Sequence, residues 1–179
     1  MISAIRNLFS PPRFQAEAHA LYLKIVETAR QPKFYTDYAV PDTIDGRFDM
    51  IALHMFLVTN RLRKDGSPEA LNLLRAVSEV FFADMDRSLR EMGSTDTGVG
   101  IRVKKMSQAF YGRQLAYQTA GDDDAKMAEA ILKNLYRADS EKRPYAVKIS
   151  EYVAQQVAAY SKLTFSQLMS GVLPALHPR

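Results

Sequence analysis

Apolar residues recur at the spacing of an α-helix along almost the whole chain, whereas the alternation typical of a β-strand never lasts over a useful length. This pattern predicts an all-α protein, folded as a single-domain bundle of about six to seven helices. The segment 46–63 is apolar on nearly all sides over two turns, which is typical of a helix at the centre of a bundle. The expected helices cover residues 13–30, 46–63, 68–92, 101–119, 122–137, 144–160 and 164–170.

Proline, serine, glycine and aspartate mark the expected helix boundaries. Pro32 ends the first helix and leaves residues 33–40 as an irregular connection. Ser67, which is followed by proline, is the expected N-cap of the third helix. Gly93 is expected to end that helix, and residues 94–100 are expected to form a polar loop. Acidic residues or proline mark the first turns of two later helices, at Asp122, Asp123, Asp124 and Pro144.

The composition is that of an ordinary globular domain, and it narrows the possible chemistry. The chain has 179 residues, of which 47% are hydrophobic and 25% charged, so it is long enough to bury a core. It contains no cysteine, which excludes disulfide bonds, thiolate metal sites and cysteine nucleophiles. Residues 1–12 are expected to form a short N-terminal segment, either at a membrane surface or disordered, ahead of a helical domain at 13–179.

The most unusual segment is basic and covers residues 99–119, in a chain whose formal net charge is only +4. Beside a conventional core face it carries a second stripe on nearly the opposite side, with Gly112 next to that stripe. Two interpretations remain open: the stripe is a binding surface, or another helix of the bundle covers it. The stripe consists of Lys104, Gln108, Tyr111 and Leu115, and the segment's cations are Arg102, Lys104, Lys105 and Arg113, with no acidic residue among them.

No pattern of residues indicates an enzyme, a metal site or a cofactor. His54 lies on the apolar central segment, where it is either a core histidine with a hydrogen-bonded ring nitrogen or a residue with a pH-sensitive contact or ligand role. Asp84 and Asp86 stand in helical register with Arg87 and Arg90, so we expect surface ion pairs, or a charged docking surface, rather than general acid–base catalysis. The three histidines form no metal-binding motif. We therefore expect no metal, no cofactor and no enzymatic activity.

Three separate motifs resemble the ubiquinol–cytochrome c chaperone family, and they occur in the order typical of it. They are VPDTIDGRFDMIALHMFLVTNRL at 40–62, FFADMDRSLREMG at 81–93 and VKKMSQAFYGRQLAY at 103–117. The resemblance covers about residues 17–137. Three motifs in the right order are far more specific than any one short pattern.

The resemblance implies an assembly factor of the cytochrome bc1 complex, which binds newly made cytochrome b without catalysing a reaction. Mitochondrial members carry targeting and membrane-attachment sequence ahead of the helical core, and they act at the ribosome exit tunnel with a small partner protein. Because this chain lacks such a segment, we expect a bacterial member that acts in the cytoplasm, peripheral to the inner membrane. Cytochrome b, the ribosome exit region and the membrane surface are the expected partners, and DNA is not.

The motifs also imply which residues contact the client, meaning the protein that the chaperone binds. An alternative function is a basic helical adaptor that docks on the ribosome or on RNA through residues 99–119. The implied partner-binding and client-binding residues are Asp42, Asp45, Arg47, Asp49, His54, Asp84, Asp86, Arg90, Glu91, Lys104, Lys105, Tyr111 and Arg113.

Overall fold

The computed structural model describes residues 14–91 and 96–175, and within these ranges it contains helices and no strand. The prediction of an all-α bundle is confirmed. The predicted segment 1–12 and the predicted C-cap Gly93 lie outside the described residues. In chain order the elements are α2 (Gln15–Ala29), α3 (Pro32–Thr36), α4 (Ile44–Asp65), α5 (Pro68–Glu91), α6 (Asp96–Ala120), α7 (Asp124–Leu135), the short 3-10 helix η1 (Ser140–Lys142), α8 (Arg143–Ser161) and α9 (Phe165–Met169).

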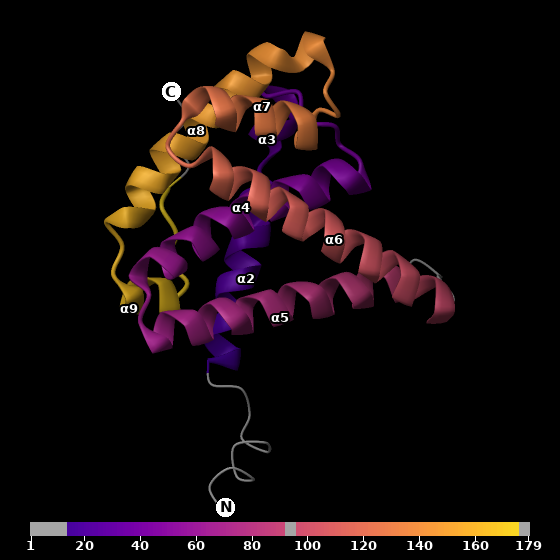
Figure 1. The fold of residues 1–179 in the computed structure, drawn as a ribbon. Helices are drawn as coiled ribbons and strands as arrows, with labels where there is room; N and C mark the ends of the chain where they lie inside the picture. The colour runs from indigo at the N-terminus through magenta and orange to yellow at the C-terminus, as the bar shows by residue number, and fades with distance from the viewer. Residues whose placement is uncertain (1–13, 92–95, 176–179) are drawn as a thin grey trace, which may run out of the picture.

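α4 lies at the centre of the bundle, as its sequence predicts (Figure 1). Every residue from 49 to 59 is buried, because α2, α5, α6, α7 and α8 all pack against this helix. Its start is sharply defined: the Thr43 hydroxyl accepts a hydrogen bond from the Gly46 amide at 3.1 Å and so caps the helix. A Cβ atom at Gly46 would lie 2.0 Å from the carbonyl oxygen of Pro41, so only glycine fits there.

α5 and α6 are the two longest helices described, and they pack against each other. Figure 1 shows that they converge at the side of the molecule opposite α8 and α9. Their contact is largely aromatic, with the rings of Phe81 and Phe110 only 4.6 Å apart between centroids. Phe82 on α5 also contacts Phe110, at 5.6 Å. This aromatic contact fixes the orientation of α6 about its own axis.

Several predicted boundaries are confirmed by local hydrogen bonds. The Ser67 hydroxyl accepts a hydrogen bond from the Ala70 amide at 3.2 Å, and thus caps α5. The Asp123 carboxylate accepts one from the Lys126 amide at 3.0 Å at the start of α7. Pro144 lies in the first turn of α8, where its missing N–H costs nothing.

Two predictions about irregular segments are wrong. Residues 33–40 are not wholly irregular, because α3 forms there. The extended Gln31, with ψ of 129°, places Pro32 at the first position of a new helical turn, so this proline begins α3 as well as closing α2. The polar loop predicted at 94–100 is shorter than expected, because α6 already begins at Asp96 and includes Gly98 and Gly100.

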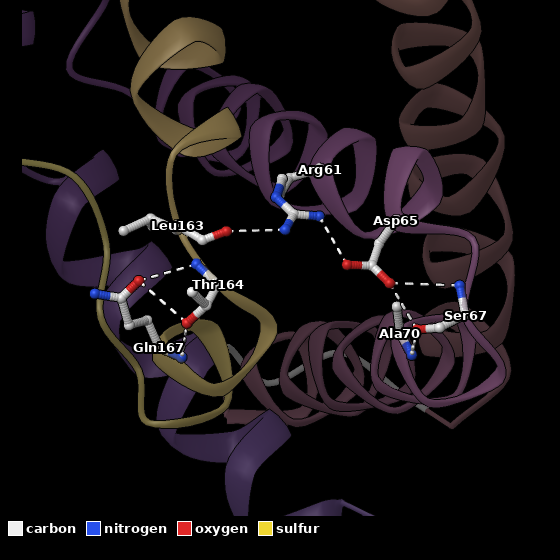
Figure 2. Close-up of polar contacts among 7 residues, drawn as sticks. All are labelled: Arg61, Asp65, Ser67, Ala70, Leu163, Thr164 and Gln167. Atoms are coloured by element: carbon white, nitrogen blue, oxygen red, sulfur yellow. Dashed lines mark hydrogen bonds and ion pairs between the residues drawn. The ribbon is translucent and has the colours of Figure 1, made fainter.

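One corner of the bundle is held by a polar clamp around Arg61 (Figure 2). The Arg61 guanidinium donates to the Asp65 carboxylate at 3.1 Å and to the carbonyl oxygen of Leu163 at 2.8 Å. Asp65 in turn accepts from the Ser67 hydroxyl at 2.6 Å. A capping box between Thr164 and Gln167 orders the start of α9 on the other side. The clamp therefore joins the α4–α5 turn to the α8–α9 turn.

Candidate functional site

The first and third sequence motifs meet at a charged cluster, called here the buried cluster after its buried carboxylate, in which Arg113 and the half-exposed Arg137 flank Asp49. Asp49 projects from α4, and its side chain is fully buried. Nη2 of Arg113, on the inner face of α6, lies 2.7 Å from one carboxylate oxygen. Nη1 of Arg137, from the turn after α7, lies 2.7 Å from the other. The cluster thus ties three elements together beneath α6.

The electrostatics of this cluster favour a structural role. Burial raises the pKa of Asp49 to about 6, an effect that outweighs the attraction of the two arginines. Neither carboxylate oxygen accepts a well-aligned hydrogen bond, so the contacts are ion pairs. The Arg113 guanidinium also lies over the Phe48 ring, at 5.4 Å from its centroid. Arg113 is therefore engaged inside the protein, although its predicted role is a contact with a partner.

Arg137 also belongs to this cluster, although it is not among the residues predicted from the sequence. It lies in a turn where Arg137 and Ala138 both have positive φ angles, of 55° and 61°. Such angles are unfavourable for residues with a Cβ atom, and here the ion pair with Asp49 helps to hold the turn. No local pattern in the sequence reveals this residue, because its partner is on a distant helix.

His54 is a core residue, 1% exposed. Its Nδ1 lies 2.8 Å from the Met50 carbonyl oxygen and therefore donates to it, so the neutral ring accepts from the Tyr152 hydroxyl at Nε2, at 2.9 Å. Burial lowers the pKa of His54 to about 4. Of the two interpretations, the satisfied core histidine is the one that the geometry supports, and a partner contact through His54 stays a prediction.

The remaining acidic residues of the first motif lie at the surface. Asp42 accepts from Nε of Arg47 at 2.7 Å, and this exposed pair holds the pKa of Asp42 below its ordinary value. Asp45 is also exposed, and its carboxylate lies 4.0 Å from Arg137. These three motif residues surround the start of α4, on the outer side of the buried cluster.

The residues of the second motif form ion pairs along α5, as the helical spacing predicts. Asp86 and Arg90 pair at 2.7 Å, and Asp84 pairs with Arg87. Asp84 also accepts a hydrogen bond from the Tyr22 hydroxyl at 2.8 Å, which joins α5 to α2. Glu91 is exposed at the last residue of α5. Because the paired carboxylates are engaged along the helix, this arrangement indicates a charged helix flank rather than an acid–base pair.

The outer face of α6, defined here as Ile101, Lys104, Gln108, Tyr111 and Leu115, is open to solvent. Ile101, Tyr111 and Leu115 are 56%, 59% and 65% exposed, and Lys104, Lys105 and Gln108 are exposed as well. The opposite face of the same helix is buried, with Val99 at 0% and Phe110 at 3%. Among the residues that the structure describes, no helix covers the stripe, so the second interpretation, cover by another helix of the bundle, is wrong for this part of the chain.

α6 is held firmly against α4 on its inner side, which makes the outer face a fixed surface. Nε2 of Gln114 donates to the Ala52 carbonyl oxygen at 2.8 Å, and the Thr59 hydroxyl donates to the Gln114 side chain at 3.2 Å. A shallow groove lies between the C-terminal end of α6 and the start of α7. The groove is lined by Ala116, Thr119, Ala120, Ala125, Lys126 and Glu129.

The structure thus distributes the predicted residues over separate places. Asp49 and Arg113 meet in the buried cluster, His54 lies in the core, and Lys104, Lys105 and Tyr111 lie on or beside the outer face of α6. In the described ranges, no three His, Cys, Asp or Glu side chains gather where they could hold a metal ion. Nor does any helix in the same ranges have the length and apolar character needed to cross a membrane.

Comparison with known proteins places the chain in a family. The family model described as Ubiquinol-cytochrome C chaperone matches residues 36–175. The chain belongs to this family. The match confirms the resemblance inferred from the three motifs, and it extends beyond them to include α8 and α9.

Relatives in animals are similar over most of this chain. The fruit fly (Drosophila melanogaster) protein named ubiquinol-cytochrome c reductase complex assembly factor 1 is 20% identical over 162 residues, which cover 88% of this family member and 62% of the fly protein. The frog (Xenopus laevis) protein of the same name is 22% identical over 158 residues, covering 88% and 78%. This chain therefore spans less than two thirds of the fly relative's length.

A solved structure supports both the family and the fold. The crystal structure of the Cbp3 homolog from Brucella abortus is 35% identical to this chaperone-family chain, with a TM-score of 0.78. The match covers 97% of this chain and 95% of the Brucella chain. The arrangement of helices described above is thus shared with a protein solved by crystallography.

Proposed function

We propose that the protein is an assembly chaperone of the ubiquinol–cytochrome c reductase (bc1) complex, and that it acts by binding a client rather than by catalysis. Its family and the names of its animal relatives support this proposal. The observation that carries the binding role is the outer face of α6, where apolar and cationic side chains stay exposed on a rigidly held helix.

The client in this proposal is newly made cytochrome b. A membrane protein awaiting its partners exposes apolar helices, and a chaperone must both cover such a surface and release it. A narrow stripe of mixed character suits moderate affinity with fast release better than a broad apolar patch would. Binding would place the chaperone at the cytoplasmic face of the inner membrane, in peripheral contact with it.

Deletion of the gene tests the proposal directly. Assembled bc1 complex should fall strongly in native gels of the membrane fraction, while an unrelated respiratory enzyme in the same membranes stays at its normal level. Affinity purification of the tagged chaperone from growing cells should recover cytochrome b. Normal bc1 levels in the deletion strain would contradict the proposal.

A second candidate function is docking on the ribosome exit region or on RNA, favoured by the exposed lysines at 104 and 105. It predicts that the protein sediments with ribosomes at low salt and is released steeply as salt rises, since contacts with phosphates release bound counterions. Absence of sedimentation with ribosomes at low salt would remove this candidate and leave the chaperone proposal untouched.

A further inference from the structure

The exposed residues of α6 follow the spacing of a helix that packs against another helix. Ile101, Lys104, Gln108, Tyr111 and Leu115 are separated by three, four, three and four residues, which is the alternation of a heptad seam. Such a seam follows one side of a helix as a narrow stripe, the surface that a partner helix covers lengthwise. Gln108, in the middle, stands at a seam position where a polar side chain restricts the register of paired helices.

Two features make the middle of this outer face suited to a close partner. Gly112 borders it, and a Cβ atom built on Gly112 meets nothing within 4 Å, so a neighbouring backbone could approach closely there. The Tyr111 ring lies 5.7 Å from the Phe82 ring and 5.5 Å from that of Phe110, although Tyr111 is 59% exposed. Tyr111 is thus held in place before any partner arrives, and this lowers the entropy that binding costs.

The charge of the outer face specifies its partner further. From residue 97 to residue 120 the helix contains no acidic residue, and the exposed Lys104 and Lys105 lie at the stripe and on its flank. A second copy of this chain would bring another lysine-bearing stripe to this face and no carboxylate from residues 97–120 to pair with the lysines, which disfavours self-association through this face. A partner that carries carboxylates beside an apolar stripe would be attracted instead.

We propose that the outer face of α6 is the docking seam for a single amphipathic helix of the client. This helix lies lengthwise along α6, places aspartate or glutamate side chains beside Lys104 and Lys105, and makes its closest approach at Gly112. Its apolar residues cover Ile101, Tyr111 and Leu115, and one end reaches the alanine-lined groove between α6 and α7. The identity of the client rests on the proposed function, whereas the helical, acidic character of the bound segment rests on α6 itself.

The test uses a photoreactive residue in place of Gln108 in the full chain, with the same residue at the exposed Ala154 on α8 as the control position. Crosslinks formed in growing cells are identified by mass spectrometry down to the peptide. We expect crosslinks from position 108 to a bc1 subunit segment that is helical and carries Asp or Glu. The yield at position 154 should be lower by about tenfold or more. A crosslink from position 108 to lipid, to RNA or to a second copy of this chain would overturn the docking seam, and so would no crosslink.

Variants then test the geometry. In the photoreactive chain, Gly112→Leu should lower the crosslink yield at position 108 about tenfold, while Gly112→Ala should lower it less, because only the larger side chain blocks close approach. Lys104→Glu should also lower the yield, whereas Lys162→Glu, the same charge change at the exposed end of α8, should not. Unchanged yields in both Gly112→Leu and Lys104→Glu would overturn the docking seam.

The result separates this inference from the proposed function. If cytochrome b is recovered equally well with Gly112→Leu and Lys104→Glu, the chaperone function stands and the seam is wrong. If position 108 crosslinks to an acidic helix of a protein outside the bc1 complex, and the variants weaken that crosslink, the seam stands and the proposed function is wrong.

Discussion

α4 and α6 have similar lengths, 22 and 25 residues, yet they have opposite relations to solvent. α4 is buried along its whole middle, including the polar Asp49, His54 and Thr59. α6 buries Val99, Phe110 and Tyr117 on one face and leaves large apolar side chains exposed on the other. The polar groups on α4 are therefore enclosed by the bundle and contribute to the fold, whereas the large apolar groups on the outer face of α6 lie at the surface, within reach of a partner.

The largest expected effect concerns the ion cluster that joins the two helices. Arg113→Ala leaves Asp49 buried with only the half-exposed Arg137 beside it, so the free energy of unfolding should fall by about 3 to 5 kcal/mol. Urea denaturation followed by circular dichroism measures this loss. Arg87→Ala is the control, since it removes an exposed ion pair and should cost less than about 1 kcal/mol. Equal losses in the two variants would show that the cluster does not stabilise the fold.

A second prediction concerns the pH dependence of the unfolding free energy, and it tests the role of His54 in the centre of α4. Burial lowers the pKa of His54 from 6.5 to about 4, so the unfolded chain takes up the proton first, and stability from this group is lost as pH falls from 6.5 to 4. The variant His54→Gln lacks this loss. Relative to the wild type, its unfolding free energy should therefore rise by about 3 kcal/mol as the pH falls from 6.5 to 4. Urea unfolding at several pH values measures it.

Asp49 changes the unfolding free energy in the opposite direction as pH falls. The contribution of His54 is therefore measured as the difference between the wild type and His54→Gln. The raised pKa of Asp49, about 6, means that the folded state binds the proton first, so this group adds stability as pH falls from 6 to 4. In the wild-type chain the two contributions offset each other in that window. A difference between wild type and His54→Gln that stays constant with pH would contradict the assignment of His54 as a neutral core group.

The third effect compares one substitution at the start of α4 with the same substitution on α6. Gly46→Ala places a methyl group against the Pro41 carbonyl oxygen, so the backbone must shift, and stability should fall by about 2 kcal/mol. Thermal unfolding should show a clearly lowered midpoint. A midpoint equal to that of the wild type would mean that the entry to α4 adapts more easily than its geometry indicates.

The smallest effect has the opposite sign. Gly112→Ala on α6 meets open space and removes a glycine from the middle of a helix, so it should raise stability by about 0.5 to 1 kcal/mol. The same thermal measurement compares it with Gly46→Ala. A decrease in stability would show that the outer face of α6 is more tightly packed than its exposure indicates. An increase would make any loss of client binding in this variant independent of folding.

The positions of the long helices could be predicted from the sequence because their signals are local. Thr43, Ser67 and Asp123 cap helices through contacts within three residues, and the apolar periodicity of α4 and α5 reports their buried faces directly. α3 was missed because Pro32 carries two signals at once, a stop for one helix and a start for the next.

The candidate site could be predicted only in part, because it depends on which helices become neighbours. The periodicity of α6 indicates two apolar stripes, but tertiary packing alone decides that Phe110 is buried and Tyr111 exposed. Likewise, nothing in the sequence around Arg113 indicates that it forms an ion pair with Asp49. The position of Arg137 depends on a positive φ angle, which residues with a Cβ atom seldom adopt. The sequence therefore names the candidate residues without assigning them to surface or core.

The clamp at Arg61 has a consequence for synthesis of the protein. Its acceptor on Leu163 lies 102 residues further along the chain, so the α4–α5 corner cannot be completed while that residue is still inside the ribosome. Helices formed earlier must wait for α8 and the start of α9 before this corner closes. The bundle therefore closes late in translation, and chains that stop short of residue 163 would lack this contact between the two turns.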